Sequence, residues 1–380
     1  MIRILSYILT APVVLLSLLW CVAALWIDGP TSRVFAGLCA ASIIAGALRC
    51  FVYIRPMSRA VAVYAIGFAV VLTWWLLIPP SNERPWLADV AELPQAVFDG
   101  DKMTVHNIRN FTYRSETDYD PQWDTRVYDL ADIKAMDLYL VYWGPTLIAH
   151  TILSWDFEDE NGKRDHLAIS IETRKEEGEE YSAVLGFFRQ FELYYVVSDE
   201  RDVVGLRANH RGEEIYLYRF NTSPDDARKI LLHYFGHINE LVDYPSWYNA
   251  MTHNCTTAAR KHTVTVAKDS PWDYRFLFNG SLDQLGHERG AFKNDIPFEE
   301  LRRRSNITDL GNEFTNLFAV GLGGGRTYAD TGVSIAGAIG SSAGGFSCKQ
   351  VMTINSELRD AANEWQRGQT RCNGKGPTYG

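Results

Sequence analysis

The sequence predicts an α+β protein in which N-terminal transmembrane helices precede a domain of antiparallel sheet plus helices. Three long apolar runs lie before residue 79. From residue 102 onward, short alternating or aromatic runs follow one another, as is typical of strands. Two helical patches come after most of these runs, and the second begins at Cys255. Strands followed by helices pack as layers of an α+β domain.

Length and charge limit the classes of protein that this chain can belong to. Its 380 residues suffice for a membrane part and one or two soluble domains. A formal net charge of −9, without a basic stripe carrying interleaved aromatic residues, argues against a nucleic-acid partner. We expect a membrane anchor over 1–79, a catalytic domain over 80–310 and a loosely ordered tail rich in Gly, Ala and Ser over 311–380.

The three apolar runs cover residues 5–27, 34–54 and 60–78. The first carries no charge, and the second carries only Arg49. Each is long enough to cross a bilayer as a helix, since about 20 apolar residues suffice. We expect three spans, with two as the alternative if the middle run forms a hairpin or a re-entrant segment.

The basic residues of the short loops predict the orientation. Arg49, Arg55 and Arg59 cluster around the link between the second and third runs. Positive loops stay in the cytoplasm. Because one span separates this link from the rest of the chain, everything after Pro79 is expected outside. In a Gram-negative cell that side is the periplasm, so the sequence predicts a multi-pass protein of the cell inner membrane.

The soluble part begins with a Pro-rich, polar stretch over 79–100, predicted to lie extended along the domain. A helix is predicted over 222–243, where a Ser-Pro-Asp start precedes apolar residues at helical spacing. The predicted strands are the runs at 104–114, 138–144, 147–157, 166–174, 191–198 and 214–220.

Cys255 is the principal candidate for chemistry. It follows a turn containing Pro245 and aromatic residues and precedes a helix-prone run. The N–H groups and positive end of a helix stabilise a thiolate at that position. The other cysteines are predicted to pack in the apolar runs or to form one disulfide in the tail: Cys21, Cys39, Cys50, Cys348 and Cys372.

A nucleophilic thiol needs a base, and His150 in a predicted strand is the candidate. The turn at 159–163 predicts a hairpin centred near Asn161. That register places His150 opposite Glu172, which could then orient the imidazole and stabilise its charged form. A slip of one residue would remove Glu172 from this face. Ser170 is then the neighbouring alternative, with His166 a weaker one.

The chemistry expected of Cys255, His150 and Glu172 is acyl transfer through a thioester. Backbone N–H groups at Cys255, with Asn254 as a candidate side-chain donor, would hold the oxyanion. His253 is a rival base, although residues two apart rarely face each other across a site. No cofactor is expected.

Asn107 and Arg109 are candidates for binding a phosphate headgroup, because the Arg fork suits oxyanions. The alternative is a strand edge whose Arg pairs with acidic residues. Tyr248 is a candidate for lining the pocket beside the thiol, or else a buried turn aromatic. His233 and His237 have the spacing of a zinc pair but lack the HEXXH form, so no metal site is predicted.

Four blocks of the soluble part resemble the Lnb N-terminal periplasmic domain family, in the same order. They are IAHTILSWDF, SIETRKEEGEEYS, FELYYVVSDERDVVGLR and PSWYNAMTHNCTTAAR, within a likeness running from about Trp86 to Arg302. The family is similar to papain-like thiol enzymes with a permuted order, His before Cys. The resemblance places its catalytic pair on His150 and Cys255.

The family's namesake transfers an acyl chain from phospholipid to lipoproteins, so the resemblance implies membrane phospholipid and lipoprotein as partners. The N-terminal spans and the Gly-rich tail depart from its pattern. The fold and the Cys-His pair therefore transfer better than the substrate does. A peptidase or amidase of envelope peptides and a non-catalytic envelope scaffold are the alternatives.

Overall fold

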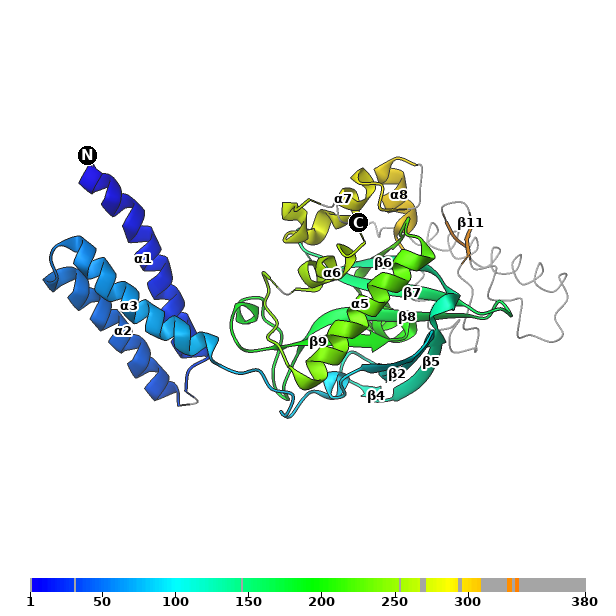
Figure 1. Ribbon diagram of the computed structural model, residues 1–380, viewed down its shortest axis with the longest axis horizontal. Helices are drawn as coiled ribbons and strands as arrows, with labels where there is room; N and C mark the ends of the chain where they lie inside the picture. Colours follow the sequence, from blue (N-terminus) through cyan, green and yellow to red (C-terminus); the bar gives the residue numbers. More distant parts are fainter. Residues whose placement is uncertain are drawn as a thin grey trace, which may run out of the picture. The chain divides into compact units, whose positions relative to one another are not determined.

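The computed structural model describes residues 2–30, 32–144, 146–252, 254–266, 271–292, 296–308, 327–329 and 332–334. Its N-terminal part consists of the helices α1 (Ile2–Ile27), α2 (Arg33–Tyr53) and α3 (Met57–Leu76) (Figure 1). All three are long and apolar enough to cross a membrane. The prediction of three apolar helices of spanning length is confirmed.

The soluble part is built on one eight-stranded sheet with the order β1-β2-β9-β8-β7-β6-β10, in which β5 also pairs with β2. Neighbouring strands are antiparallel except β2 and β9. The α+β expectation is therefore confirmed. The strands are β1 (Gln95–Asp99), β2 (Lys102–Arg109), β5 (Trp123–Asp129), β6 (Ile133–Tyr142), β7 (His150–Glu158), β8 (Arg164–Arg174), β9 (Glu192–Ser198) and β10 (Glu214–Arg219).

One face of the sheet carries the apolar core. Helix α5 (Pro224–Asp243) crosses this face, as Figure 1 shows. Trp155 of β7 and Ile171 of β8 share a buried cluster with Tyr234 of α5. The indole of Trp155 also donates to the carbonyl of Ala227, 2.9 Å away. Alternate residues of a strand point to opposite faces, so the intervening residues of β7 and β8 point away from α5.

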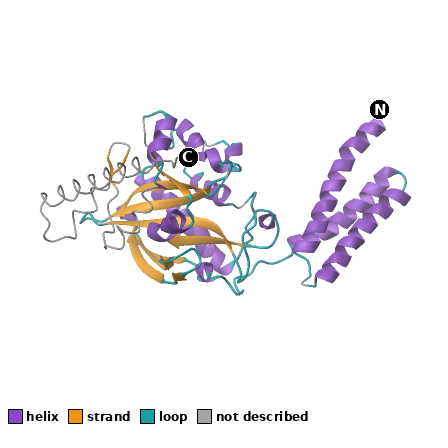
Figure 2. Cartoon of the chain, turned by 180° about the vertical axis from the view of Figure 1, so that it is seen from behind, coloured by secondary structure: helices purple, strands orange, loops and turns teal. Residues whose placement is uncertain are grey.

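The opposite face is more polar and is covered by α4 (Glu200–Gly205) and the π-helical turn Leu206–His210 that continues it. The hydroxyls of Tyr139 and Ser154 both donate to Oε1 of Glu200, at 2.8 and 2.7 Å. Figure 2 shows the sheet from behind, with helices on both of its faces. The central strands are buried on both sides, so the polar side chains that β7 and β8 direct to this face, such as Ser154 and Ser170, are buried as well.

The stretch after α3 lies on the domain, as expected. Asn82 donates to the carbonyls of Leu241 and Val242 at the end of α5, both at 2.9 Å. Arg84 forms a 3.0 Å ion pair with Glu192. The stretch is less extended than expected, because it contains a short 3-10 turn and the edge strand β1.

The structure adds elements that the sequence patterns did not indicate. Strand β2 ends at Arg109, and within it Asn107 has a φ of +59° where the pairing with β5 shifts between Val105 and Ile108. The strands β1 and β5 and the helix α4 were not predicted. The other short elements are β3 (Thr112–Tyr113), β4 (Tyr119–Asp120), α7 (Leu282–Glu288), α8 (Phe298–Ser305) and the 3-10 turns Ala88–Val90, Leu130–Asp132, Leu185–Phe187, Tyr274–Phe276 and Asn279–Ser281.

The chain divides into two compact units, residues 1–320 and 321–380. In the second, the described residues form the hairpin of β11 (Thr327–Ala329) and β12 (Gly332–Ser334). The predicted disulfide between Cys348 and Cys372 lies outside the described residues.

Candidate active site

Cys255 is the first residue of α6 (Cys255–Thr263), as its turn-to-helix setting predicted. Asn254 caps this helix: its side-chain oxygen accepts hydrogen bonds from the backbone N–H groups of Thr256 and Thr257, at 3.0 and 2.8 Å. The Thr257 hydroxyl accepts in return from the Asn254 N–H, completing a capping box. The thiol is thus held at the positive end of the helix.

Asn254 was expected to donate to the oxyanion, but in the structure its side chain has a different role. Its side-chain oxygen is taken up by the cap, and its Nδ2 donates to the carbonyl of Ala250, 2.8 Å away. Asn is among the best N-cap residues, because a short side chain can reach back to the free N–H groups of the first turn. Asn254 therefore positions Cys255 by fixing where α6 begins.

His150 is the first residue of β7 and lies beside Glu172 of β8. The hairpin pairs Ile152 with Ser170 and Glu158 with Arg164, so it is centred at Asn161 and its register continues to His150 opposite Glu172. Nε2 of His150 is 3.0 Å from Oε1 of Glu172. The predicted register is confirmed.

Ser170, the alternative to Glu172 in the sequence, joins it in contacting the imidazole. Its Oγ is 2.6 Å from Nε2 of His150 and donates to Oε1 of Glu172 at 2.7 Å. The carboxylate and the hydroxyl both lie at Nε2, so Nδ1 is the ring nitrogen that these two groups leave available. A histidine whose one nitrogen is fixed in this way has a defined orientation and tautomer.

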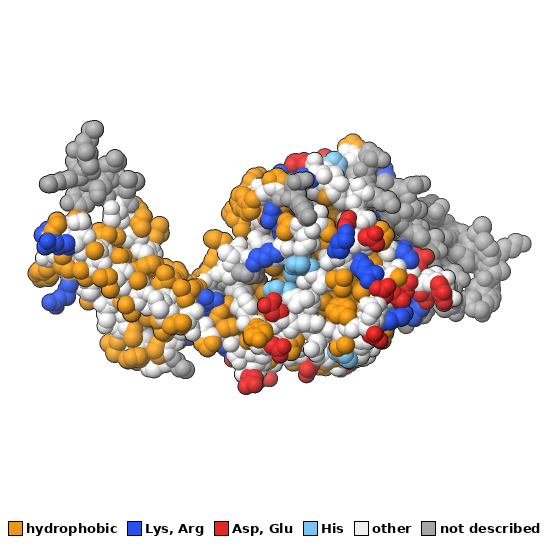
Figure 3. Space-filling model, in the orientation of Figure 1, with side chains coloured by type: hydrophobic (Ala, Val, Ile, Leu, Met, Phe, Trp, Pro, Cys, Tyr) orange, Lys and Arg blue, Asp and Glu red, His pale blue; other side chains and the backbone are white. Residues whose placement is uncertain are grey.

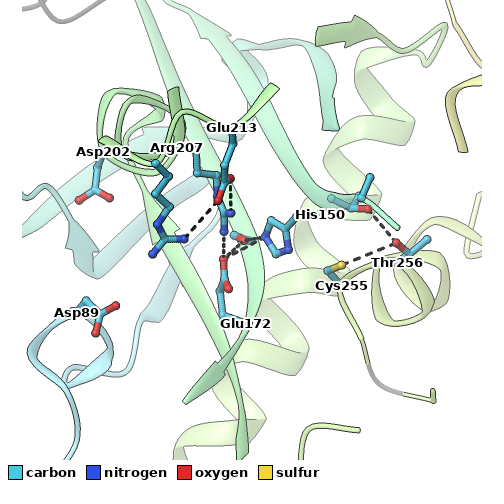
Figure 4. A network of polar contacts seen from close by, with 12 residues as sticks. Asp89, His150, Glu172, Asp202, Arg207, Glu213, Cys255 and Thr256 are labelled. Carbon is cyan, nitrogen blue, oxygen red and sulfur yellow. Dashed lines mark hydrogen bonds and ion pairs between the residues drawn. The ribbon is translucent and has the colours of Figure 1, made fainter. Parts of the chain in front are cut away.

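Cys255 and His150 reach the site from different layers. The His150 and Glu172 side chains belong to the face covered by α4, whereas Thr151 points to the other face and contacts Thr256 of α6 through a 2.8 Å hydroxyl pair. The two layers meet at the end of β7. There the thiol of Cys255 and the imidazole of His150 are hydrogen-bonded, and Figure 4 shows the ring between Glu172 and Cys255.

Asn279, which was not identified as a site residue from the sequence, connects the start of β7 to the first turn of α6. It is buried and contacts the backbone of Ala149 in both directions: its Oδ1 accepts from the Ala149 N–H at 2.8 Å, and its Nδ2 donates to the Ala149 carbonyl. The same Nδ2 donates to the hydroxyl of Thr256. Asn279 thereby fixes the start of β7 against the first turn of α6. Its lone Asn-Gly-Ser sequence gave no signal for this role.

Arg207 contacts the carboxylate of Glu172 and was not identified from the sequence either. Its guanidinium donates to Oε1 of Glu172 at 2.8 Å and to Oε2 of Glu213 at 3.0 Å (Figure 4). Arg207 lies in the π-helical turn, an irregularity frequent at functional sites. Only the folded structure brings this residue, 35 positions beyond Glu172 in the chain, against the carboxylate.

The protonation states follow from these contacts. Burial disfavours the charged imidazole, but the carboxylate of Glu172 outweighs it and raises the pKa of His150 to about 9. Burial likewise opposes ionisation of the thiol, yet the charge and hydrogen bond of His150 lower the pKa of Cys255, with help from the Thr151 N–H and the Thr256 hydroxyl. Despite its own burial, Glu172 has a pKa well below its usual value because of His150 and Arg207. The geometry favours a thiolate–imidazolium pair.

Tyr248 lies close to the thiol, as its predicted role in lining the pocket requires. It is buried, and its hydroxyl is hydrogen-bonded to that of Tyr181. Burial raises the pKa of Tyr248, and the negative charge of Cys255 raises it further. Two neutral phenols therefore stand beside the sulfur.

Asn107 and Arg109 do not belong to this site. Arg109 is buried, and its Nε and Nη2 donate to Oδ1 of Asp202 at 2.9 and 2.7 Å. Asn107 donates to the carbonyl of Leu93. Because these groups are engaged inside the fold, the predicted phosphate contact is wrong, and the alternative of an Arg paired with an acidic residue is what the structure shows.

The remaining histidines lie elsewhere. Nδ1 of His233 is 2.8 Å from Nδ1 of His262, and Nε2 of His262 is 2.9 Å from the hydroxyl of Tyr195. Within the described part of the chain, no three His, Cys, Asp or Glu side chains are arranged to hold a metal ion. His166 is 3.6 Å from Asp156, a different carboxylate. His253 lies outside the described residues.

Comparison with known proteins agrees with the resemblance seen in the sequence. Residues 119–280 match the family model of the Lnb N-terminal periplasmic domain. The matched range contains His150, Glu172, Arg207, Cys255 and Asn279. The chain matches no curated protein and no solved structure. Residues 119–280 are thus similar to the Lnb N-terminal periplasmic domain, and the chain is a membrane-associated protein in which this region follows three apolar helices.

Proposed function

We propose that this protein is a cysteine-dependent acyl-transfer enzyme of the inner membrane, acting on the acyl groups of lipids or lipoproteins in the periplasm. The observation that supports it is the hydrogen-bonded pair of Cys255 and His150, with Glu172 behind the imidazole. A thiolate, a general acid-base and an orienting carboxylate are the parts that acyl transfer through a thioester requires.

In the first half-reaction the Cys255 thiolate attacks the carbonyl carbon of an ester and forms a C–S bond. The tetrahedral intermediate collapses with cleavage of the C–O bond, and the imidazolium of His150 gives its proton to the departing alkoxide. In the second half, neutral His150 takes a proton from an amine or water as that group attacks the thioester. The thiolate leaves, and the ion pair is restored.

Backbone N–H groups are the best candidates for the oxyanion. The Asn254 cap occupies the N–H groups of Thr256 and Thr257, and the Cys255 N–H, at the first position of α6, is not among them. The Thr151 N–H already donates to the sulfur. Both groups lie next to the atom at which the tetrahedral centre forms, where fixed donors lower the barrier most.

The membrane helices support a lipid substrate. The chain leaves its last apolar helix at Leu76 and contacts the domain from Ile78 onward, whose carbonyl accepts from the indole of Trp247 at 3.0 Å. A domain tethered so closely to a span works at the bilayer surface, where acyl groups are concentrated.

The test is a fatty thioester on Cys255. Full-length protein in phospholipid vesicles is incubated and its intact mass measured, with Cys255→Ala and, as a matched control, Cys39→Ala in the second helix. We expect an acyl adduct in the wild type and in Cys39→Ala, its removal by neutral hydroxylamine, and none in Cys255→Ala. An adduct that persists in Cys255→Ala, or the absence of both adduct and turnover in the wild type, would contradict the proposal. Turnover of envelope peptides without an acyl adduct would identify a peptidase or amidase instead.

A further inference from the structure

We propose that the mouth of the Cys255 site is seated in the lipid surface of the membrane, through an apolar rim made of two groups of loops. The rim consists of side chains that are 42 to 64% exposed although they are large and hydrophobic: Leu147, Ile148, Val184, Phe187 and Phe278. Figure 3 shows hydrophobic side chains gathered at the end of the domain that carries these loops. Large apolar side chains exposed together in this way mark an interaction site.

The first group of loops adjoins the thiol through Tyr248. The Gly186 carbonyl accepts from the Ala250 N–H at 2.8 Å, and Tyr181 is hydrogen-bonded to Tyr248. A Cβ on Gly186 would lie 3.4 Å from the Tyr248 ring, so the loop carrying Val184 and Phe187 packs directly on the aromatic wall of the site.

The second group adjoins the imidazole. Leu147 and Ile148 immediately precede Ala149 and His150 in the chain. The Gly280 N–H donates to the Leu147 carbonyl at 3.1 Å, which brings Phe278 and its neighbours beside this segment. The rim residues therefore come from segments attached to both members of the Cys-His pair.

Contacts with the ends of two spans indicate that the partner is the bilayer rather than another protein. The Arg189 N–H and the Gln190 side chain donate to Oδ1 of Asp28, at 3.1 and 2.7 Å, and Asp28 directly follows α1. The guanidinium of Arg189 also lies 4.2 Å from the ring centroid of Trp75, near the end of α3. Spans end at the headgroup layer, where Trp and Arg are favoured.

The loop that bears Val184 and Phe187 is thus anchored at the depth of the headgroups. Exposed aliphatic and aromatic side chains at that depth insert into the boundary between headgroups and acyl chains. An acyl carbonyl could then reach the sulfur without its chain crossing water. This use of the rim rests on the proposed function, whereas the seating itself does not.

Photocrosslinking of the full-length chain in nanodiscs of phosphatidylethanolamine and phosphatidylglycerol tests the seating. p-Benzoylphenylalanine is placed at Phe278 or Phe187, and for comparison at Phe98 or Val127, which are 39 and 63% exposed on β1 and β5. We expect phospholipid adducts at the rim at least about fivefold above the β1 and β5 positions, because only the rim would contact acyl chains. Equal yields at the four positions, or rim adducts to protein alone in native membranes, would overturn the proposal.

Activity distinguishes this proposal from the proposed function. The double variant Val184→Ser, Phe278→Ser should lose about tenfold or more turnover on bilayer phospholipid and stay within about twofold on a short-chain soluble thioester, because only the bilayer substrate depends on insertion. An equal loss on both substrates would contradict a membrane role of the rim. Crosslinking repeated in Cys255→Ala should be unchanged. Lipid adducts at the rim without any Cys255-dependent turnover would contradict the proposed enzyme activity but would support contact between the rim and the membrane.

Discussion

At the scale of the residue, the charge of His150 is set by competing neighbours. Burial and the guanidinium of Arg207 disfavour its protonated form, and the carboxylate of Glu172 and the thiolate of Cys255 favour it. The carboxylate dominates, because it lies in direct contact at Nε2 in a region with little water to screen it. His150 is therefore expected to be charged at neutral pH in the resting protein.

This balance predicts a bell-shaped pH dependence of kcat/KM. Activity should rise as Cys255 ionises, below the usual thiol range, and fall as His150 loses its proton at about 9. Glu172→Gln removes the main group that raises the pKa of His150, so the alkaline limb should move to lower pH, by roughly one unit or more. Initial rates from pH 4 to 11 measure this shift. Glu176→Gln, whose carboxylate pairs with Arg84, is the control and should leave the limb in place. An unmoved limb in Glu172→Gln would mean that the carboxylate does not act on the imidazole.

Arg207→Met should shift the alkaline limb in the opposite direction. Arg207 lowers the pKa of His150, so its removal should raise that pKa and extend activity to higher pH. The same change leaves Glu172 and Glu213 without their shared cation, which should cost about 3 kcal/mol of stability. The pH dependence of kcat/KM and chemical denaturation, measured on Arg207→Met and Glu172→Gln side by side, test the shift in pKa and the loss of stability. Shifts of the same sign in Arg207→Met and Glu172→Gln would refute this account of the electrostatics.

The Glu172 contacts also predict how stability depends on pH. A carboxylate whose pKa is depressed on folding contributes stability above its unfolded pKa of about 4.5, and this contribution is lost as the pH falls through the folded value. The wild type should therefore lose more stability than Glu172→Gln between about pH 5 and 2. Thermal unfolding at a series of pH values tests this difference. Parallel curves for the two proteins would contradict it.

At the scale of the element, the site depends on how α6 and β7 are clamped together at their ends. The capping box fixes the first residue of α6, and the hairpin register fixes the first residue of β7. Asn279 then bonds to both through Thr256 and Ala149. Each element carries one reacting group on its terminal residue, so a small shift of either end would separate the thiol from the imidazole.

Gly280 offers a test of this clamp. A Cβ at this position would lie 1.8 Å from the Thr146 carbonyl oxygen, and backbone atoms cannot yield as a flexible side chain can. Gly280→Ala should displace the segment before His150, with a loss of about 2–4 kcal/mol of stability and most of the activity. Gly236→Ala is the matched control: its Cβ meets nothing within 4 Å, and Ala favours the interior of α5 by about 1 kcal/mol. Chemical denaturation and rate measurements on Gly280→Ala and Gly236→Ala test these expectations. A Gly280→Ala protein with wild-type stability and turnover would show that this contact does not hold the site.

At the scale of the whole molecule, the arginine-rich link between the second and third helices predicts which side of the membrane the domain occupies. Alkaline phosphatase fused after Gly380 should be active and green fluorescent protein fused there dark, since the first matures only outside the cytoplasm. Fusions after Arg55 should give the reverse. Replacing Arg49, Arg55 and Arg59 together by Gln should weaken this preference, because positive loops are retained in the cytoplasm. A fluorescent protein that is bright after Gly380 in the wild type would place the domain inside.

The sequence by itself determined the apolar helices, six of the eight strands of the sheet, the start of α6 and the hairpin register. All of these depend on local signals: an apolar run, an alternating pattern, a capping residue or a turn. The pairing of His150 with Glu172 belongs here too, because a short hairpin fixes its own register.

Only the tertiary structure decided that Arg207 supports Glu172, that Asn279 joins the two layers, and that Arg109 is buried against Asp202. It also reassigned Asn254 from oxyanion donor to helix cap. These contacts join residues or layers whose approach depends on how helices cover the two faces of the sheet. Local patterns do not encode that approach, because an arginine or asparagine has the same appearance in a sequence whether it faces a ligand, a carboxylate or the backbone.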